Sequence, residues 1–86
     1  MNEFTAIHVD LLLALHAAGE GGVPFATLLT DLRRGRHQGL TEPQLLAALR
    51  LIGDRSLAAG FGSALGTPRW RITSRGVSAL AEEGLL

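Results

Sequence analysis

The chain has 86 residues, of which 47% are hydrophobic and 19% are charged. This length fits one compact domain, and the composition is too apolar and too weakly charged for an intrinsically disordered protein. Because the sequence contains no cysteine, disulfides and cysteine-based zinc sites are excluded. Eight basic and eight acidic residues give a formal net charge of zero, so the total charge offers no argument for a nucleic-acid partner.

A first helix is predicted over residues 3–18. Its main apolar face recurs at helical spacing and consists of Phe4, Ile7, Leu11 and Leu15. A second apolar stripe beside it consists of Val9, Leu12 and Leu13. One small domain has no room to bury both stripes, and soluble monomers avoid exposed apolar patches, so we expect the second stripe to form a homodimer interface. The alternative is a monomer whose last residues fold back over Val9 and Leu13.

An apolar run over residues 11–15 raises the question of a signal peptide or a membrane span. Glu3 and Asp10 precede this run, but no basic residue does, and a signal peptide needs a basic start. The run is also far shorter than the roughly 20 residues that cross a bilayer. We therefore expect a cytoplasmic protein with no membrane association.

A second helix is predicted over residues 24–34. Pro24 suits the first helical turn, and Gly35 ends the helix. The last turn carries Arg33 and Arg34, where cations complement the helix dipole. A short connection that contains Arg36 then leads to the next helix.

The third helix, over residues 41–54, has the clearest start signal in the sequence. Thr41 and Gln44 fit a capping box, in which Thr41 is the N-cap. The inward face carries Leu45, Leu49 and Ile52. The opposite side carries Pro43, Ala47, Arg50 and Asp54, with Leu51 at its edge.

The pattern then changes to alternation over residues 56–73. Leu57, Ala59 and Phe61 alternate as a short strand, and a glycine-rich turn follows. In the next strand Trp70 and Ile72 share one face, and Arg69 and Arg71 share the other. A last helix is predicted over residues 74–83. The expected fold is a single α+β domain over residues 1–86 that is mostly helical, with three helices, a two-stranded β-hairpin and a C-terminal helix.

The residues at the end of this pattern carry a family resemblance. The run consists of Trp70, Ile72, Thr73, Gly76 and Leu80, and it follows the helical residues Leu45, Leu49 and Ile52. Over residues 23–81 the chain resembles the winged helix-turn-helix domain of MarR- and PadR-type bacterial transcriptional regulators. The resemblance implies double-stranded DNA as the partner, with the third helix in the major groove and the hairpin, or wing, beside the backbone.

On this reading the candidate DNA-binding residues are Arg33, Arg34, Arg36, Thr41, Gln44, Arg50, Arg69, Arg71 and Arg75. Arg50 is the candidate for base reading, because a guanidinium can pair with guanine. The arginines at the end of the second helix fit phosphate contacts or a solvated last turn equally well. Those near the wing fit backbone contacts, or ion pairs with Glu82 or Glu83. We expect a short palindromic operator bound by a dimer.

A protein partner is the alternative to DNA. The wing tip over residues 62–67 has no basic residue, Leu65 makes it apolar, and Leu51 is expected to be exposed. His8, His16 and His37 have no third ligand beside them, so neither a metal nor another cofactor is expected. No nucleophile, base and acid form a catalytic set, so we do not expect an enzyme. Trp70 is expected to be a core residue.

Overall fold

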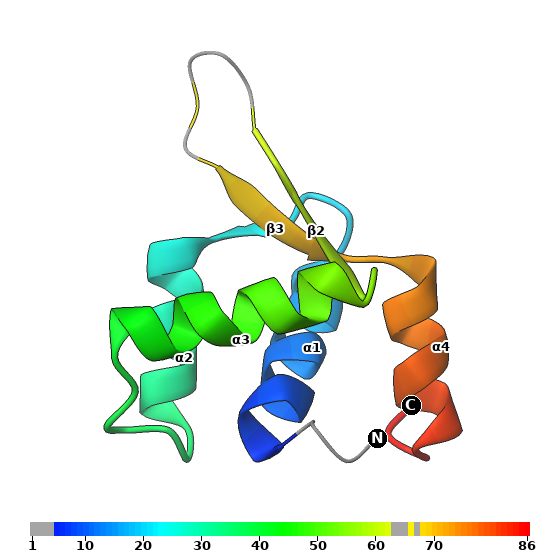
Figure 1. Cartoon of the computed structure of the whole chain (residues 1–86), viewed down its shortest axis with the longest axis horizontal. Helices are drawn as coiled ribbons and strands as arrows, with labels where there is room; N and C mark the ends of the chain where they lie inside the picture. The colour runs from blue at the N-terminus through cyan, green and yellow to red at the C-terminus, as the bar shows by residue number, and fades with distance from the viewer. Residues whose placement is uncertain (1–4, 63–65, 67) are drawn as a thin grey trace.

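The computed structural model describes residues 5–62, 66 and 68–86. Phe4 and Leu65, which were named above, lie outside this part of the chain. The elements in chain order are α1 (Ala6–Ala18), β1 (Val23–Pro24), α2 (Phe25–Arg34), α3 (Glu42–Asp54), β2 (Ala58–Phe61), β3 (Arg69–Ile72) and α4 (Ser74–Glu82). Figure 1 shows the helices grouped together and the β2–β3 wing projecting from them. No helix in the described part of the chain is long and apolar enough to cross a membrane.

The sheet is antiparallel and has three strands, in the order β1-β3-β2. The expected two-stranded hairpin is present, and β1 extends it because Val23 pairs with Trp70 and Pro24 pairs with Arg69. Pro24 was predicted inside the second helix, which was wrong by one residue. Its φ of −68° fits a helix, but its ψ of 156° is extended, so α2 begins at Phe25. A proline cannot donate to a ladder, which suits its place on an edge strand.

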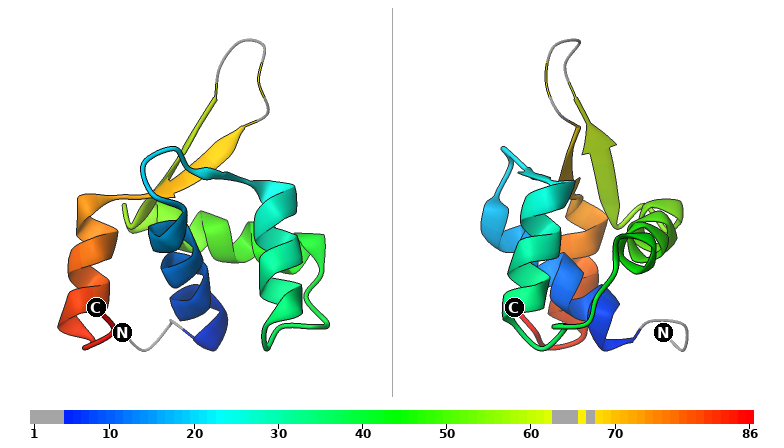
Figure 2. Two further views of the ribbon diagram at one scale, coloured as in Figure 1. Left: turned by 180° about the vertical axis from the view of Figure 1, so that it is seen from behind. Right: turned by 90° about the vertical axis from the view of Figure 1, so that its left-hand side faces the viewer.

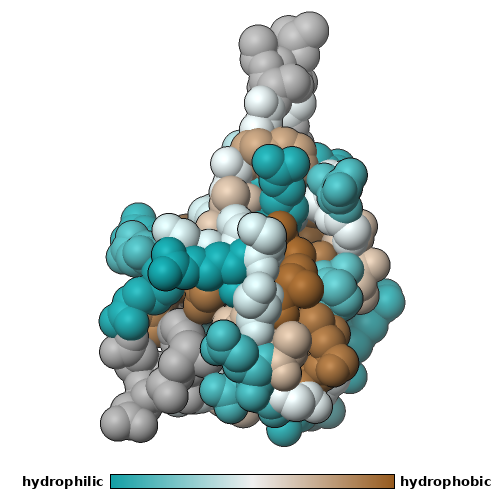
Figure 3. Space-filling view, turned by 90° about the vertical axis from the view of Figure 1, so that its right-hand side faces the viewer, coloured by the Kyte–Doolittle hydropathy of each residue, from teal (hydrophilic) through white to brown (hydrophobic). Residues whose placement is uncertain are grey.

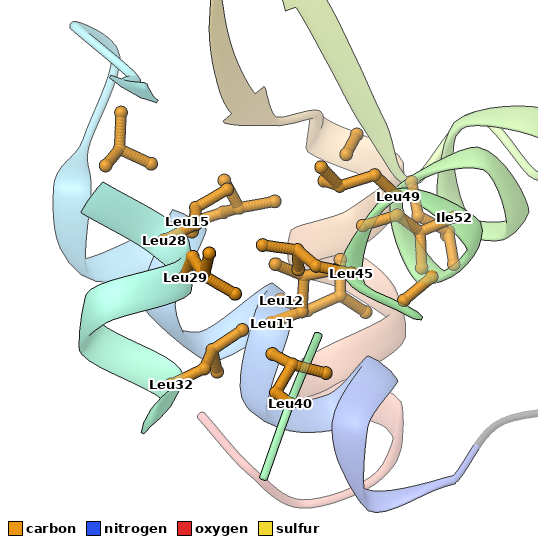
Figure 4. Packing of buried hydrophobic residues seen from close by; sticks show 14 of the residues in the cluster. Leu11, Leu12, Leu15, Leu28, Leu29, Leu32, Leu40, Leu45, Leu49 and Ile52 are labelled. Atoms are coloured by element: carbon orange, nitrogen blue, oxygen red, sulfur yellow. The ribbon is translucent and has the colours of Figure 1, made fainter. Parts of the chain in front are cut away.

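The core lies between the four helices and the inner face of the sheet. Figure 4 shows leucine side chains from α1, α2 and α3 pointing toward one another. The large side chains that are fully buried are Leu11, Leu15, Leu28, Leu45, Leu49, Ile52 and Leu80. Val23 and Ala58 also belong to the core. Trp70 and Ile72 pack against this core, as expected from their alternation with Arg69 and Arg71.

The helix α1 is central rather than peripheral, and one residue of the expected dimer stripe is therefore buried in the core. It packs against α2, α3, α4 and β3. A helix that is surrounded in this way is apolar on several sides. Leu12 is therefore a core residue with 3% of its surface exposed, and it offers nothing to a partner. Val9 and Leu13 are half-buried, so they retain exposed surface.

Hydroxyl caps start the two helices that follow the connecting loops. The Thr41 hydroxyl accepts a hydrogen bond from the Gln44 amide (3.3 Å), and the Gln44 side chain accepts one from the Thr41 amide (2.9 Å). The predicted capping box is thus confirmed. At the start of α4, Thr73 accepts a hydrogen bond from the Gly76 amide (3.1 Å) and donates one to the Ser56 carbonyl (2.6 Å). Thr73 therefore ties α4 to the segment that follows α3.

Candidate nucleic-acid interface

One side of α3 faces solvent beside the wing and the start of α2. The helix crosses the front of the molecule in Figure 1, and the side view in Figure 2 shows it end-on, away from the other helices. Its exposed side chains are Glu42, Pro43, Gln44, Leu46, Ala47, Arg50 and Asp54. Arg50 is therefore accessible to a ligand, as the sequence predicted. The carboxylates of Glu42 and Asp54 lie on the same helix and reduce its positive charge.

Thr41 and Gln44 have structural partners at the start of α3. The Thr41 hydroxyl and the Gln44 side-chain carbonyl each accept a backbone hydrogen bond in the capping box. Both residues remain exposed at this end of the helix. If these two residues contact DNA, as predicted, they must do so while their side-chain oxygens still accept the hydrogen bonds of the cap.

The arginines at the end of α2 fasten the connection between α2 and α3. Arg33 donates from Nε to the Leu40 carbonyl (2.8 Å). Arg36 donates from Nε and Nη2 to the two carboxylate oxygens of Asp10 on α1 (2.6 and 2.8 Å). His37 Nε2 lies 2.6 Å from Asp10 Oδ2. The hydrogen bond from Arg36 is the main reason why the pKa of Asp10 is below its usual value, although partial burial opposes the shift.

This fastened connection is far from the wing. In Figures 1 and 2 the end of α2 and the following loop lie at one end of the molecule, and the wing projects from the other end. Arg33, Arg34 and Arg36 therefore do not join the wing arginines in one basic surface. The positions of these arginines in the sequence do not predict this separation, because their hydrogen-bond partners Leu40 and Asp10 lie outside the arginine-rich segment.

Arg69 and Arg71 lie on the outer face of the sheet. Arg69 donates to the carbonyls of Gly21 (3.0 Å, from Nε) and Gly22 (3.2 Å, from Nη2), and so ties β3 to the loop before β1. The Arg71 guanidinium lies 5.2 Å from the centre of the Phe61 ring, which is a cation–π contact. Both side chains remain exposed. Within the described residues, neither forms the ion pair with Glu82 or Glu83 that was the alternative expectation.

The structure also shows an apolar component that the sequence reading missed. Phe25, Glu42, Pro43 and Leu46 line a shallow hollow of about 430 Å³ between the starts of α2 and α3. Leu46 is 38% exposed. Leu51, which was expected to be exposed, is half-buried instead. A helical wheel that included Leu46 would have placed it on the same side as Pro43 and Arg50, about one turn from each.

A second hollow of about 600 Å³ lies on the wing side of α2. It is lined by Pro24, Ala26, Thr27, Phe61, Gly62, Gly66 and Arg69. Phe61 is 37% exposed there. The start of α2 therefore has a hollow on each side, and the face as a whole is mixed, with apolar surface around a few cations.

Comparison with known proteins agrees with this fold. No protein-family model and no curated protein matches the chain. Solved structures of MepR from S. aureus, a MarR-family regulator, do match. A MepR mutant superimposes with a TM-score of 0.77 at 18% identity, over 93% of this chain and 56% of MepR. MepR bound to ethidium bromide gives 0.74 at 17% identity, over 92% and 54%. A second mutant, bound to an oligodeoxyribonucleotide, gives 0.73 at 17% identity, over 95% and 61%.

These similarities confirm that the chain has the winged helix fold expected from the sequence. The chain spans a little over half the length of the MepR structures that it matches.

Proposed function

We propose that the chain is a DNA-binding transcriptional regulator and not an enzyme, and that it acts in the cytoplasm. In this proposal α3 enters the major groove and the wing lies along the backbone. The observation that carries it is the solvent-facing side of α3, which presents Arg50 in a fold shared with MepR bound to an oligodeoxyribonucleotide.

Arg50 would form hydrogen bonds with a base, and neighbouring residues would contact thymine methyl groups and phosphates. A guanidinium can pair with the O6 and N7 atoms of guanine. Leu46 and Ala47 are exposed on the same helix and could contact thymine methyl groups. Arg71, and the part of Arg69 not bonded to the glycine carbonyls, would contact phosphates. Arg33 and Arg36 are left out, because their guanidinium groups hold the α2–α3 connection.

Binding to duplex DNA at several salt concentrations tests the proposal. We expect affinity for genomic fragments to fall steeply as salt rises, because phosphate contacts release counterions. Arg50→Ala should reduce discrimination between fragments by about 1–3 kcal/mol at the base that it reads. Arg34→Ala is the matched control, since it removes the same charge from the end of α2 that lies far from the wing. Equal effects of the two substitutions, or no binding at low salt, would argue against this function.

A protein partner is the second candidate, and the hollow at Phe25, Pro43 and Leu46 favours it. The hollow exposes apolar surface from these three residues together, and contiguous exposed apolar surface often marks a protein interaction site. Glu42 and Asp54 are exposed on the same helix as Arg50 and offset its charge, whereas DNA-binding modules usually carry a surplus of basic residues.

Leu46→Lys distinguishes the two candidates. The substitution adds a cation to α3, so a DNA-binding face should hold duplex DNA as tightly as before or more tightly. The same substitution puts a charge into the hollow, so an apolar protein partner should be lost. Anisotropy with labelled duplex and pull-down from the source cells, each with Arg34→Ala as control, give the two readouts.

A further inference from the structure

The middle of α3 presents mainly apolar side chains on its exposed side. Between Gln44 and the end of the helix, which the structure describes throughout, the exposed residues before the last one are Leu46, Ala47 and Arg50. Recognition helices contact base edges chiefly with residues of their N-terminal part, where Leu46 and Ala47 lie. Pro43 has no amide hydrogen, so the backbone at the start of the helix also lacks one donor.

Gln44 is the other uncharged side chain on this side that can form hydrogen bonds with a base. Glutamine recognises adenine through two hydrogen bonds, one from its amide nitrogen and one to its carbonyl oxygen. The Gln44 carbonyl oxygen accepts the Thr41 amide (2.9 Å), which holds the side chain over the first turn. Glu42 and Asp54 stand at the two ends of the helix. Base recognition by hydrogen bonds is therefore concentrated in Arg50.

Leu46 and Ala47 lie one turn before Arg50. Residues three and four apart are neighbours on a helix surface and are separated along the axis by about 4.5–6 Å. Successive bases are about 3.4 Å apart along the duplex, so the base next to a guanine bound by Arg50 is within reach of both apolar side chains. Leu46 is 38% exposed and lines, with Phe25 and Pro43, the hollow of about 430 Å³. An apolar group on the edge of that base has space there.

Apolar surface alone does not single out α3. Figure 3 shows an apolar band on the face of the molecule that carries α4. The exposed side of α3 differs because its apolar side chains lie one turn from a guanidinium that can pair with guanine. An apolar contact and a hydrogen-bonding contact are thus available to neighbouring bases.

We propose that this side of α3 recognises the 5-methyl group of a pyrimidine next to the guanine bound by Arg50. The methyl group of thymine is the apolar group that base pairs present in the major groove. Cytosine carries the same group at the same ring position once it is methylated. Leu46 and Ala47 have no hydrogen-bonding group in their side chains, so they respond to the methyl group and not to the oxygen or nitrogen beside it. Methylation of cytosine therefore raises the affinity of the chain for such a site.

This inference rests on the proposed function and deepens it, because it names the chemical group that the DNA-binding side distinguishes. It gives the apolar surface beside Arg50 a role in DNA binding. In the alternative function, the same surface binds an apolar side chain of a protein partner. The two roles differ in one measurable respect, which is whether removing a methyl group from a duplex changes its affinity for the chain.

Replacement of thymidine by deoxyuridine tests the role of the methyl group. Duplexes that bind the chain are selected at low salt from a pool of short random sequences and are then remade with deoxyuridine at one thymidine at a time. The exchange removes a methyl group and keeps the base pairing. Next to the guanine bound by Arg50, we expect the affinity measured by anisotropy to fall about threefold to fivefold, the effect of exposing one buried methyl group. Exchanges elsewhere should have no effect.

Substitutions in α3 assign the effect to its side chains. Leu46→Ala should reduce the response to the exchange to less than about twofold, because the shorter side chain buries less of the methyl group. Arg50→Ala should keep the response and lose the preference for the neighbouring guanine, which identifies that guanine. Leu86→Ala is the matched control, since Leu86 is 53% exposed at the C-terminus, across the molecule from the start of α3 (Figure 1). The Tm of each variant checks that the fold is retained.

Cytosine methylation distinguishes the two sources of the methyl group. A C·G pair replaces the T·A pair at the same position, with or without the 5-methyl group on cytosine. We expect unmethylated cytosine to bind about threefold to fivefold more weakly than thymine, and 5-methylcytosine to return to within about twofold of thymine. A methylated site that binds no more tightly than the unmethylated one would overturn the proposal.

The remaining outcomes separate this inference from the proposed function. Salt-dependent binding that is indifferent to deoxyuridine at every position overturns the inference and leaves the proposed function intact. A response to the methyl group that Leu46→Ala leaves unchanged, or that Leu86→Ala abolishes, also overturns the inference. If the chain binds no duplex at low salt, both proposals fail.

Discussion

Gly76 in α4 packs directly against the backbone carbonyl of Leu57, at the point where the chain leaves α3 for the wing. A Cβ atom at Gly76 would collide with that carbonyl oxygen and would lie 2.6 Å from Cγ1 of Ile72. The absence of a side chain at this position therefore lets α4 approach the start of the wing closely. The contact fixes α4 against the base of the wing.

Gly76→Ala should destabilise the domain, although alanine is the better helix former. The collision involves backbone, which has little freedom to move, and overpacking of this kind costs about 1–3 kcal/mol. Gly53→Ala in α3 is the control, because a Cβ there meets nothing within 4 Å. That substitution should raise the free energy of unfolding by about 0.5–1 kcal/mol. Urea denaturation of both variants measures the contrast, and a Gly76→Ala protein as stable as the Gly53→Ala protein would contradict the packing.

Trp70→Ala should be among the most destabilising substitutions in the wing. The ring packs against the core and covers Gly60, where a Cβ would touch it at 3.4 Å. Because Trp70 is only half-buried, we expect a loss of about 3 kcal/mol, at the low end for an aromatic side chain. Thermal unfolding measures it, with Trp70→Phe as the milder variant. An unchanged Tm would mean that the ring is a surface contact.

Local signals in the sequence identified most of the fold. The start of α3 was predictable because a capping box is formed by neighbours three residues apart. The faces of β3 were predictable because strand side chains alternate. In contrast, β1 has only two residues and exists because β3 pairs with it, so nothing in Val23 and Pro24 alone indicates a strand.

The candidate site was less predictable, because its charges are distributed by tertiary contacts. Arg36 reaches Asp10, which is 26 residues away in the sequence, and Arg69 reaches Gly21, which is 48 residues away. Arginines that are close together in the sequence therefore form hydrogen bonds at separate places in the fold and do not make one basic surface. The burial of Leu12 also depends on tertiary contacts, because α1 is surrounded by other elements. The apolar stripe alone does not indicate which elements pack against it.

Asp10→Asn should loosen the connection before α3. Asp10 accepts hydrogen bonds from Arg36, and these hydrogen bonds are the main cause that lowers the pKa of its carboxyl, with a smaller contribution from the charge of Arg36. A group with a depressed folded-state pKa adds stability above its unfolded pKa of about 3.9, and this stability is lost as the pH falls through the folded-state value. The difference in Tm between the variant and the unmodified chain should therefore be present at neutral pH and shrink below about pH 4.

Hydrogen exchange locates the effect of Asp10→Asn. The amides of His37 and Leu40, which bond to the carbonyls of Leu32 and His37, should lose protection first. Asp31→Asn on α2 removes the same charge where no side-chain hydrogen bond or ion pair is formed among the described residues, and it should leave these amides protected. If both variants lose protection at these amides equally, the hydrogen bonds between Asp10 and Arg36 do not hold the connection between α2 and α3.

His8 should make the start of α1 sensitive to pH. Its Nδ1 atom lies 3.0 Å from the Thr5 amide and accepts its hydrogen bond, in the position that glutamate or glutamine takes in a capping box. A protonated ring has no lone pair at Nδ1, so the cap needs the neutral form. Burial lowers the pKa of His8 below 6.5, which means that the unfolded chain binds a proton more readily than the folded one.

Stability from this cap is therefore present above about pH 6.5 and decreases as the pH falls through the lower folded-state pKa of His8. His8→Gln keeps an acceptor that does not titrate, so it should flatten the pH dependence in this range without lowering the Tm at pH 8. His16→Gln is the control, because the His16 side chain lies exposed in the last turn of α1, where only the backbone carbonyl of His16 takes part in the helix cap. Thermal unfolding between pH 5 and 8 compares the three proteins. If the Tm of His8→Gln depends on pH in the same way as that of the unmodified chain, His8 is not the titrating group.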